Sequence, residues 1–124
     1  KYDNEINQNI VWTHSGTKQT EAEPFELSQI YQDLNVGEIM LNSIDRDGMM
    51  KGYDIELGNK ISKNLEIPLI LCGGGGNFNH LVEVFNKTEV AATACGSLFH
   101  FGDNSPMRAR SYLKNQKILM RSIK

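Results

Sequence analysis

Three short segments of the chain combine residue types that could bind or transform a small molecule. The first is the run Asn42-Ser43-Ile44-Asp45-Arg46-Asp47-Gly48, in which the carboxylates of Asp45 and Asp47 stand one residue apart. Carboxylates in a loop at a strand end could position a substrate or move protons. A solvated turn explains the same residues equally well, because Asp and Gly are common turn formers. A calcium loop is excluded, because methionines at 49 and 50 occupy the places of a ligand and of an obligatory glycine.

The second segment is Cys72-Gly73-Gly74-Gly75-Gly76-Asn77, between an apolar strand and a helix. Glycines let backbone N–H groups approach an anion closely at the start of a helix. The dinucleotide-binding fingerprint is excluded because Phe78 stands where its third glycine belongs, and no Gly-Lys-Ser/Thr follows as in a nucleotide-hydrolase loop. A tight turn needs fewer than four consecutive glycines. The segment therefore favours phosphate binding.

The third segment is Gly96-Ser97, which follows the next strand. Its N–H groups and hydroxyl could complete the same anion site, although the dipeptide alone is a weak signal. Glu38 begins a buried strand; Glu is rarely buried without a partner, and a solvent-facing strand end is the simpler interpretation. The three histidines show no metal-ligand spacing. We therefore expect no metal ion and no cofactor.

Hydrophobic periodicity predicts a repeating order of helix and strand that positions these segments. Proline can begin a helix without losing a hydrogen bond, so helices should begin at Pro24 and at Ser105-Pro106. Strands that are apolar on both faces are typical of a parallel sheet, either open or closed into a barrel. The expected elements are a hairpin turn over 1–9, a strand over 10–13, a polar loop over 15–23, helices beginning near 24, 53, 78 and 105, and strands over 37–44, 67–71 and 90–94.

Composition excludes several classes of protein. The 124 residues carry a net charge of −2, which argues against a nucleic-acid partner. No apolar run approaches the ~20 residues that span a bilayer, and no signal segment stands at the start. Cys72 and Cys95 each lie in an apolar run, which fits buried reduced thiols and a cytoplasmic protein.

Taken together, these segments resemble the cyclase subunit family of imidazole glycerol phosphate synthase. The matching segments are residues 11–20, 37–54, 67–76 and 97–101, so the resemblance runs from about residue 10 to the C-terminus. The run Ser-Ile-Asp-Arg-Asp-Gly at 43–48 is the most specific of them. The resemblance implies a (β/α)₈ TIM barrel. The chain would supply the C-terminal half: 1–23 as hairpin and loop, and 24–124 as three helix–strand repeats ending in a C-terminal helix.

The resemblance also implies roles and partners. The family takes ammonia from a glutaminase and converts a phosphorylated sugar intermediate into imidazole glycerol phosphate and an aminoimidazole carboxamide ribotide, in histidine biosynthesis. Its main acid/base aspartates would precede Lys1. The 124 residues alone should therefore be inactive. As half a barrel, they should self-associate or fold only partly. The implied site residues are Asp45 and Asp47 in supporting catalysis, Asn42, Gly73, Gly74, Gly96 and Ser97 in substrate binding, and Glu38 at the ammonia entry.

Four positions depart from the histidine-pathway pattern. Asn42 replaces the usual Thr, Cys72 a Ser, Gly75 an Ala or Val, and Gly96 an Ala. These residues resemble a paralogous branch that delivers ammonia for acetamidino-sugar synthesis in surface polysaccharide. The histidine-pathway cyclase is the leading interpretation and this branch the alternative. A third alternative is a non-catalytic module that binds phosphate or docks a glutaminase.

Overall fold

The computed structural model describes residues 1–121, and the chain begins with two small β-hairpins. Strand β1 (Tyr2–Asp3) pairs with β2 (Gln8–Asn9), and β3 (Trp12–Thr13) pairs with β4 (Lys18–Gln19), both antiparallel. The sequence predicts a loop over 15–23, but part of it is the strand β4. A turn with positive φ at 14–16 reverses the chain there, and polar composition does not distinguish such a turn from a longer loop.

Helices and strands then alternate along the rest of the described chain, as the periodicity predicts. Pro24 stands in the first turn of its helix, and the Ser105 hydroxyl accepts a hydrogen bond from the N–H of Arg108 at 3.2 Å. Residues 122–124, the end of the expected C-terminal repeat, lie outside the described residues. The elements are α1 (Pro24–Asp33), β5 (Ile39–Asn42), α2 (Ile55–Ser62), β6 (Leu69–Cys72), α3 (Phe78–Lys87), β7 (Ala92–Ala94), α4 (Ser97–His100) and α5 (Pro106–Asn115). The single turn α4 was not expected, because four residues show no periodicity.

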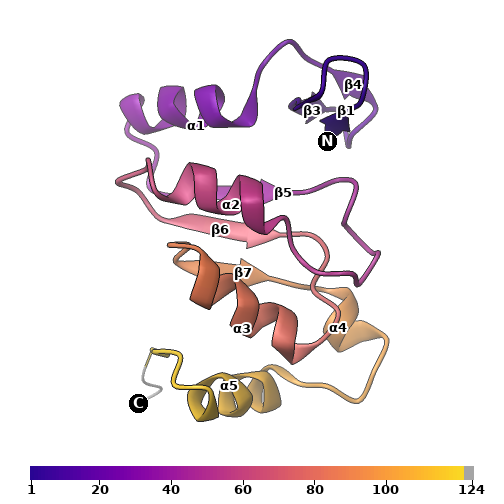
Figure 1. Cartoon of the computed structure of the whole chain (residues 1–124), viewed down its shortest axis with the longest axis vertical. Coiled ribbons are helices and arrows are strands. Elements are labelled where there is room, and N and C mark those ends of the chain that lie inside the picture. The colour runs from indigo at the N-terminus through magenta and orange to yellow at the C-terminus, as the bar shows by residue number, and fades with distance from the viewer. Residues whose placement is uncertain (122–124) are drawn as a thin grey trace.

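The strands β5, β6 and β7 form a parallel sheet in that order, which confirms the α/β class. Ile39 pairs with Leu69, and Ile70 pairs with Ala92. Because all the strands run the same way, their carboxyl ends lie at one edge of the sheet. The loops that follow β5, β6 and β7 therefore meet at this edge (Figure 1).

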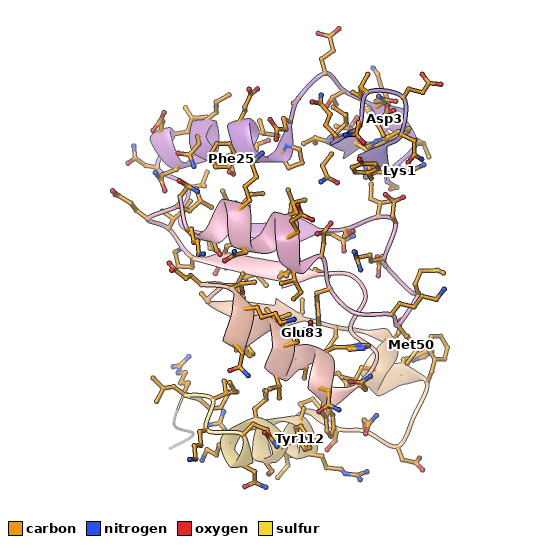
Figure 2. The ribbon with its side chains drawn as sticks, viewed as in Figure 1. Lys1, Asp3, Phe25, Met50, Glu83 and Tyr112 are labelled. Atoms are coloured by element: carbon orange, nitrogen blue, oxygen red, sulfur yellow. The ribbon has the colours of Figure 1, made fainter. Side chains whose placement is uncertain are left out.

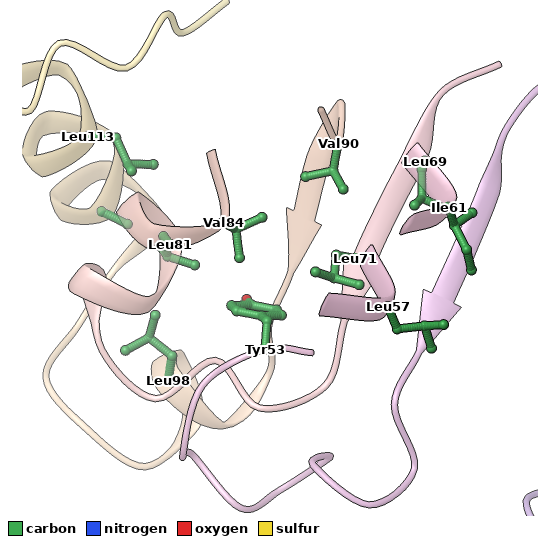
Figure 3. Packing of buried hydrophobic residues seen from close by; sticks show 11 residues of the cluster. Tyr53, Leu57, Ile61, Leu69, Leu71, Leu81, Val84, Val90, Leu98 and Leu113 are labelled. Carbon is green, nitrogen blue, oxygen red and sulfur yellow. The ribbon is translucent and has the colours of Figure 1, made fainter. Parts of the chain in front are cut away.

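The core lies between one face of the sheet and the helices α2 and α3 (Figure 3). Leu69 and Leu71 of the central strand are buried, and Ile61 and Val84 of the two helices are buried with them. Tyr53, at the entry to α2, is only 3% exposed. Leu71 touches the backbone of α2, because a Cβ at Gly58 would lie 2.9 Å from its Cδ2.

The other face of the sheet carries the alternate residues of each strand. On this face Met40 is 58% exposed, while Ile70 and Cys72 are half-buried. The sequence also predicts that Ile39, Leu41, Ile70 and Val90 lack a place to be buried within the 124 residues. For Ile39, Leu41 and Val90 that expectation was wrong, because they pack on the helix side of the sheet, with Val90 inside the core and the other two against it.

Both outer helices extend past the sheet. Helix α1 lies beyond β5, and α5 lies beyond β7 (Figure 1). A cavity of about 350 Å³ runs along β5, between that strand, α1 and the hairpins, and one of about 490 Å³ runs along β7 beside α5. The buried Nε1 of Trp12, whose side chain lines the first cavity, has no hydrogen-bond partner among the described residues. Both edge strands thus lie beside unfilled, largely apolar grooves.

We expect the isolated 124-residue chain to self-associate or to fold only partly. Burial of apolar surface stabilises a protein by about 25 cal/mol per Å². Exposing one sheet face and two grooves to water therefore lowers the free energy of unfolding by several kcal/mol, compared with a usual total of about 5–15 kcal/mol. Two-fold pairing of copies would restore this burial. Sedimentation velocity combined with near-UV circular dichroism measures both outcomes.

The matched control is Met40→Glu, which charges the exposed sheet face without touching the core. It should shift the isolated chain towards monomer and increase its unfolded fraction. A compact wild-type monomer with cooperative unfolding would contradict the expectation.

Candidate anion-binding site

Three loops come together at the carboxyl edge of the sheet. They are residues 43–52 after β5, residues 73–77 after β6, and residues 95–96 between β7 and α4. The first two touch backbone to backbone: the N–H of Ser43 donates to the carbonyl of Cys72 at 3.1 Å, and the N–H of Gly52 donates to that of Gly74 at 2.8 Å. The first of these bonds extends the ladder between β5 and β6 beyond the strands.

This close contact explains two of the glycines. A Cβ at Gly73 would lie 2.7 Å from the carbonyl oxygen of Ser43, and a Cβ at Gly74 would collide with the carbonyl of Gly52. Both glycines also have positive φ, of 91° and 103°, a conformation that other residues adopt only with strain. The run of glycines is therefore required by packing as well as by any ligand.

Several backbone donors at this edge are free. Among the described residues, the N–H groups of Gly74, Gly75, Gly96 and Ser97 donate to no protein acceptor, whereas that of Gly76 donates to Nδ1 of His80 at 3.2 Å. Free N–H groups from neighbouring loops can bind an anion by several hydrogen bonds at once.

The residues that carry these donors line a cavity of about 20 Å³, together with Asp47, Gly48, Met50, Gly73 and the two cysteines. That volume holds about one water molecule, so a phosphate would lie at the mouth of the cavity. Met50, one of the lining residues, is labelled near α4 in Figure 2.

The cysteines beside the cavity are neutral thiols. Burial raises the pKa of the Cys72 thiol, and the carboxylate of Asp47 raises it further. Burial likewise raises the pKa of Cys95. Both cysteines are free rather than disulfide-bonded. Because raised pKa values keep the thiols protonated at neutral pH, neither of them repels an anion.

Asp47 connects the small cavity with a larger hollow. The Nδ2 of Asn42 donates to Oδ2 of Asp47 at 3.3 Å, and a Cβ at Gly73 would lie 3.0 Å from Oδ1 of the same asparagine. Asp47 and Gly48 also line an open hollow of about 760 Å³, whose other walls are Trp12, Ser15, Gly16, Asn42 and Ile44. A molecule with its anion at the glycines and its body in the hollow would pass the Asp47 carboxylate.

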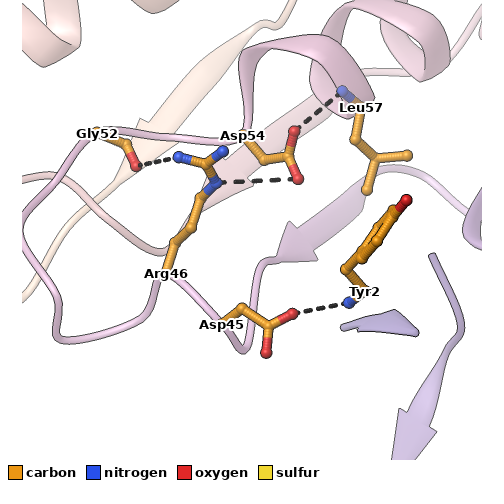
Figure 4. Close-up of polar contacts among 6 residues, drawn as sticks. All are labelled: Tyr2, Asp45, Arg46, Gly52, Asp54 and Leu57. Carbon is orange, nitrogen blue, oxygen red and sulfur yellow. Dashed lines mark hydrogen bonds and ion pairs between the residues drawn. The ribbon is translucent and has the colours of Figure 1, made fainter. Parts of the chain in front are cut away.

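Asp45 does not share this position. Its Oδ2 accepts a hydrogen bond from the N–H of Tyr2 at 2.7 Å, on the side of the first hairpin (Figure 4). Glu38 precedes β5 and is exposed at the opposite end of the sheet. The structure thus brings together Asn42, Asp47, Gly73, Gly74, Gly96 and Ser97. It separates Asp45 and Glu38 from them.

Sequence reasoning missed the part played by Tyr53. Its hydroxyl donates to the carbonyl of Ala94 at 3.1 Å, and a Cβ at Gly75 would lie 2.8 Å from its Cζ. Burial raises the pKa of this hydroxyl, which therefore stays protonated. Tyr53 thus joins the loop after β5 to the end of β7 beneath the glycines. Position 53 reads in the sequence as an ordinary apolar residue at a helix start, so no signal pointed to this bond.

Residues 1–121, the described part of the chain, lack two kinds of feature. No group of three or more His, Cys, Asp or Glu in this range is arranged to hold a metal ion. No helix in this range is long and apolar enough to cross a membrane.

Comparison with known proteins gives a consistent result. Residues 3–105 match the model of the family described as histidine biosynthesis protein. The chain is 44% identical over 112 residues to imidazole glycerol phosphate synthase subunit HisF of Chlorobaculum parvum, covering 90% of this chain and 45% of the relative. It is 44% identical over 112 residues to the same subunit of Chlorobaculum tepidum, with the same coverage.

A third relative carries a different designation. The chain is 45% identical over 91 residues to the hisF2 subunit of Pseudomonas aeruginosa, covering 73% of this chain and 36% of the relative. The chain thus spans less than half the length of these relatives. The family match covers most of the chain, and we conclude that the chain belongs to the histidine biosynthesis protein family, among the cyclase subunits of imidazole glycerol phosphate synthase and their paralogues.

Proposed function

We propose that this chain is part of a cytoplasmic cyclase subunit of imidazole glycerol phosphate synthase. The full-length enzyme would use ammonia from a glutaminase partner to form imidazole glycerol phosphate and aminoimidazole carboxamide ribotide in histidine biosynthesis. One observation carries this proposal. The Asp47 carboxylate lies between an open hollow and a cluster of free N–H groups suited to a phosphate. That arrangement fits a phosphorylated sugar substrate.

We also propose that the sheet is the C-terminal half of a (β/α)₈ barrel. Support comes from the outer helices: each lies past its edge strand and leaves an apolar groove where a further strand would pair. The exposed face with Met40 and Ile70 would then line the barrel interior. A ring of parallel strands removes both free edges at once.

The two ends of the sheet fit different tasks. The carboxyl ends of barrel strands carry the active site in this fold, and Asp47 and the glycines lie there. Glu38 lies at the amino end, exposed to solvent, where ammonia would enter from the glutaminase. Asp47 would orient the substrate or exchange protons with it, in support of aspartates supplied by the rest of the barrel. The 124 residues alone would then have no turnover.

A second candidate is the paralogue that delivers ammonia for acetamidino-sugar synthesis. Three of the residues that depart from the histidine-pathway pattern, Cys72, Gly75 and Gly96, line the small cavity, and the fourth, Asn42, bonds to Asp47. The departures thus lie where they would contact a substrate. The similarity to the hisF2 subunit favours the same candidate. A non-catalytic module that binds phosphate or docks a glutaminase is the third.

Product analysis of the full-length protein separates these functions. The protein is mixed with its glutaminase, glutamine and the histidine-pathway intermediate, and again with ammonium replacing glutaminase and glutamine. We expect both products from the wild-type protein. In Asp47→Asn the rate should fall at least about tenfold, because a side-chain amide cannot accept or release a proton as a carboxylate does. The melting temperature of this nearly isosteric variant should stay close to wild type.

Absence of product with the histidine-pathway intermediate, but ammonia release coupled to an acetamidino-sugar precursor, would support the second candidate. Absence of both would support the non-catalytic module. Normal activity of Asp47→Asn with a stability loss of several kcal/mol would assign that residue to a structural turn.

The phosphate site should depend on close backbone approach. We expect Gly74→Val in the full-length protein to weaken binding of a phosphosugar by more than about tenfold, because the side chain would push the glycine loop off the carbonyl of Gly52. Ser97→Ala should have a smaller effect, since the backbone N–H groups remain. Calorimetric titration measures both.

Gly96→Ala is the matched control, because a Cβ there meets nothing within 4 Å. It should bind the phosphosugar nearly as wild type does. Unchanged affinity in Gly74→Val would remove the glycine loop from the site.

A further inference from the structure

The side chains of the adjacent residues Asp45 and Arg46 extend in different directions, Asp45 to Tyr2 and Arg46 to Gly52 and Asp54 (Figure 4). Oδ2 of Asp45 accepts the N–H of Tyr2 in strand β1. The guanidinium of Arg46 turns towards the start of α2, with Nη1 3.4 Å from the carbonyl of Gly52 and Nε 4.0 Å from Oδ2 of Asp54. The dipeptide thus lies between the first hairpin and the α2 end of its own loop.

Few other contacts could replace the hydrogen bond between Asp45 and Tyr2. Among the described residues, it is the one hydrogen bond from residues 1–9 to any part of the chain beyond β4. The first hairpin is also joined to the second: Nε2 of Gln19 donates to Oδ2 of Asp3 at 2.9 Å, and Nζ of Lys1 lies 4.9 Å from the centre of the Trp12 ring. The second hairpin and its turn supply Trp12, Ser15 and Gly16 to the hollow beside Asp47. A hairpin released at Tyr2 would therefore loosen one wall of that hollow.

The bonds on the other side reach the glycine loop. Asp54 is fixed because its Oδ1 caps α2 by accepting the N–H of Leu57 at 3.1 Å. Gly52, whose carbonyl Arg46 contacts, donates its own N–H to the carbonyl of Gly74. The Cβ of Arg46 also lies within 3.2 Å of the point where a Cβ at Gly74 would stand. Arg46 thus braces the segment on which the glycine loop rests.

We propose that Asp45 and Arg46 are positioning residues that fix the first hairpin and the glycine loop relative to each other. Asp47 is then the carboxylate of the loop after β5 that faces the ligand. A carboxylate suits the first task because its hydrogen bond to a backbone N–H is charge-assisted. The effect on catalysis rests on the proposed function. The bracing of the hairpin does not, because it requires no substrate.

Hydrogen–deuterium exchange in the full-length protein tests the bracing directly. In Asp45→Ala, the peptide covering residues 1–9 should exchange about tenfold faster than in wild type, which is the loss expected for one charge-assisted hydrogen bond. Asp45→Asn keeps an acceptor oxygen and should have a smaller effect. The matched control is Asp47→Asn, which should leave the exchange of this peptide unchanged.

Kinetics of the same variants test the division of roles. Asp45→Ala should raise KM for the phosphorylated substrate several-fold with little change in kcat, whereas Asp47→Asn should lower kcat. Unchanged exchange of residues 1–9 in Asp45→Ala and Asp45→Asn would overturn the proposal. So would a fall in kcat in Asp45→Asn equal to that of Asp47→Asn. If the enzyme proves inactive on the histidine-pathway substrate, only the proposed function fails, and the exchange result still decides the bracing.

Discussion

The backbone contact between Gly52 and Gly74 is the constraint on which the candidate site depends. The hydrogen bond from the N–H of Gly52 holds the carbonyl of Gly74 inward, against the loop that follows β5. The glycine loop then has N–H groups at 74 and 75 that no described protein acceptor occupies. No side chain larger than hydrogen fits between the two loops at 74. The position of the candidate anion site is therefore fixed by backbone packing rather than by a charged side chain.

This constraint also separates the carboxylates of the β5 loop. With the loop pressed against the glycines, Asp47 lies beside both cavities, and Asp45 lies on the far side against the hairpin. Tyr53 supports the arrangement from below through its bond to Ala94. The neutral thiols of Cys72 and Cys95 complete the wall of the small cavity; among its described lining residues none is a cation and Asp47 is the one anion. In the proposed site the backbone N–H groups would thus be the main attraction for a phosphate.

Much of this organisation could be predicted from the sequence. The apolar strands, the proline at position 24 and the Ser105 cap gave the order of helices and strands, and the glycine run identified the loop that now has free donors. Other features depend on contacts between distant residues. The bond of Asp45 to Tyr2 spans 43 positions, and nothing local to an Asp-Arg-Asp run indicates which carboxylate turns outward. The side on which Ile39 and Val90 are buried depended on strand register, which the apolar runs did not reveal.

The central claim is that the free N–H groups of the glycine loop and of the turn into α4 form one phosphate site. Titration of the full-length protein with inorganic phosphate, followed by the amide nitrogen and proton shifts in NMR, tests this claim most directly. The account predicts that the amides of Gly74, Gly75, Gly96 and Ser97 shift together with a single dissociation constant. The amide of Gly76, which donates to His80, should shift much less. Saturation at different phosphate concentrations for the two loops, or shifts confined to residues elsewhere in the chain, would contradict it.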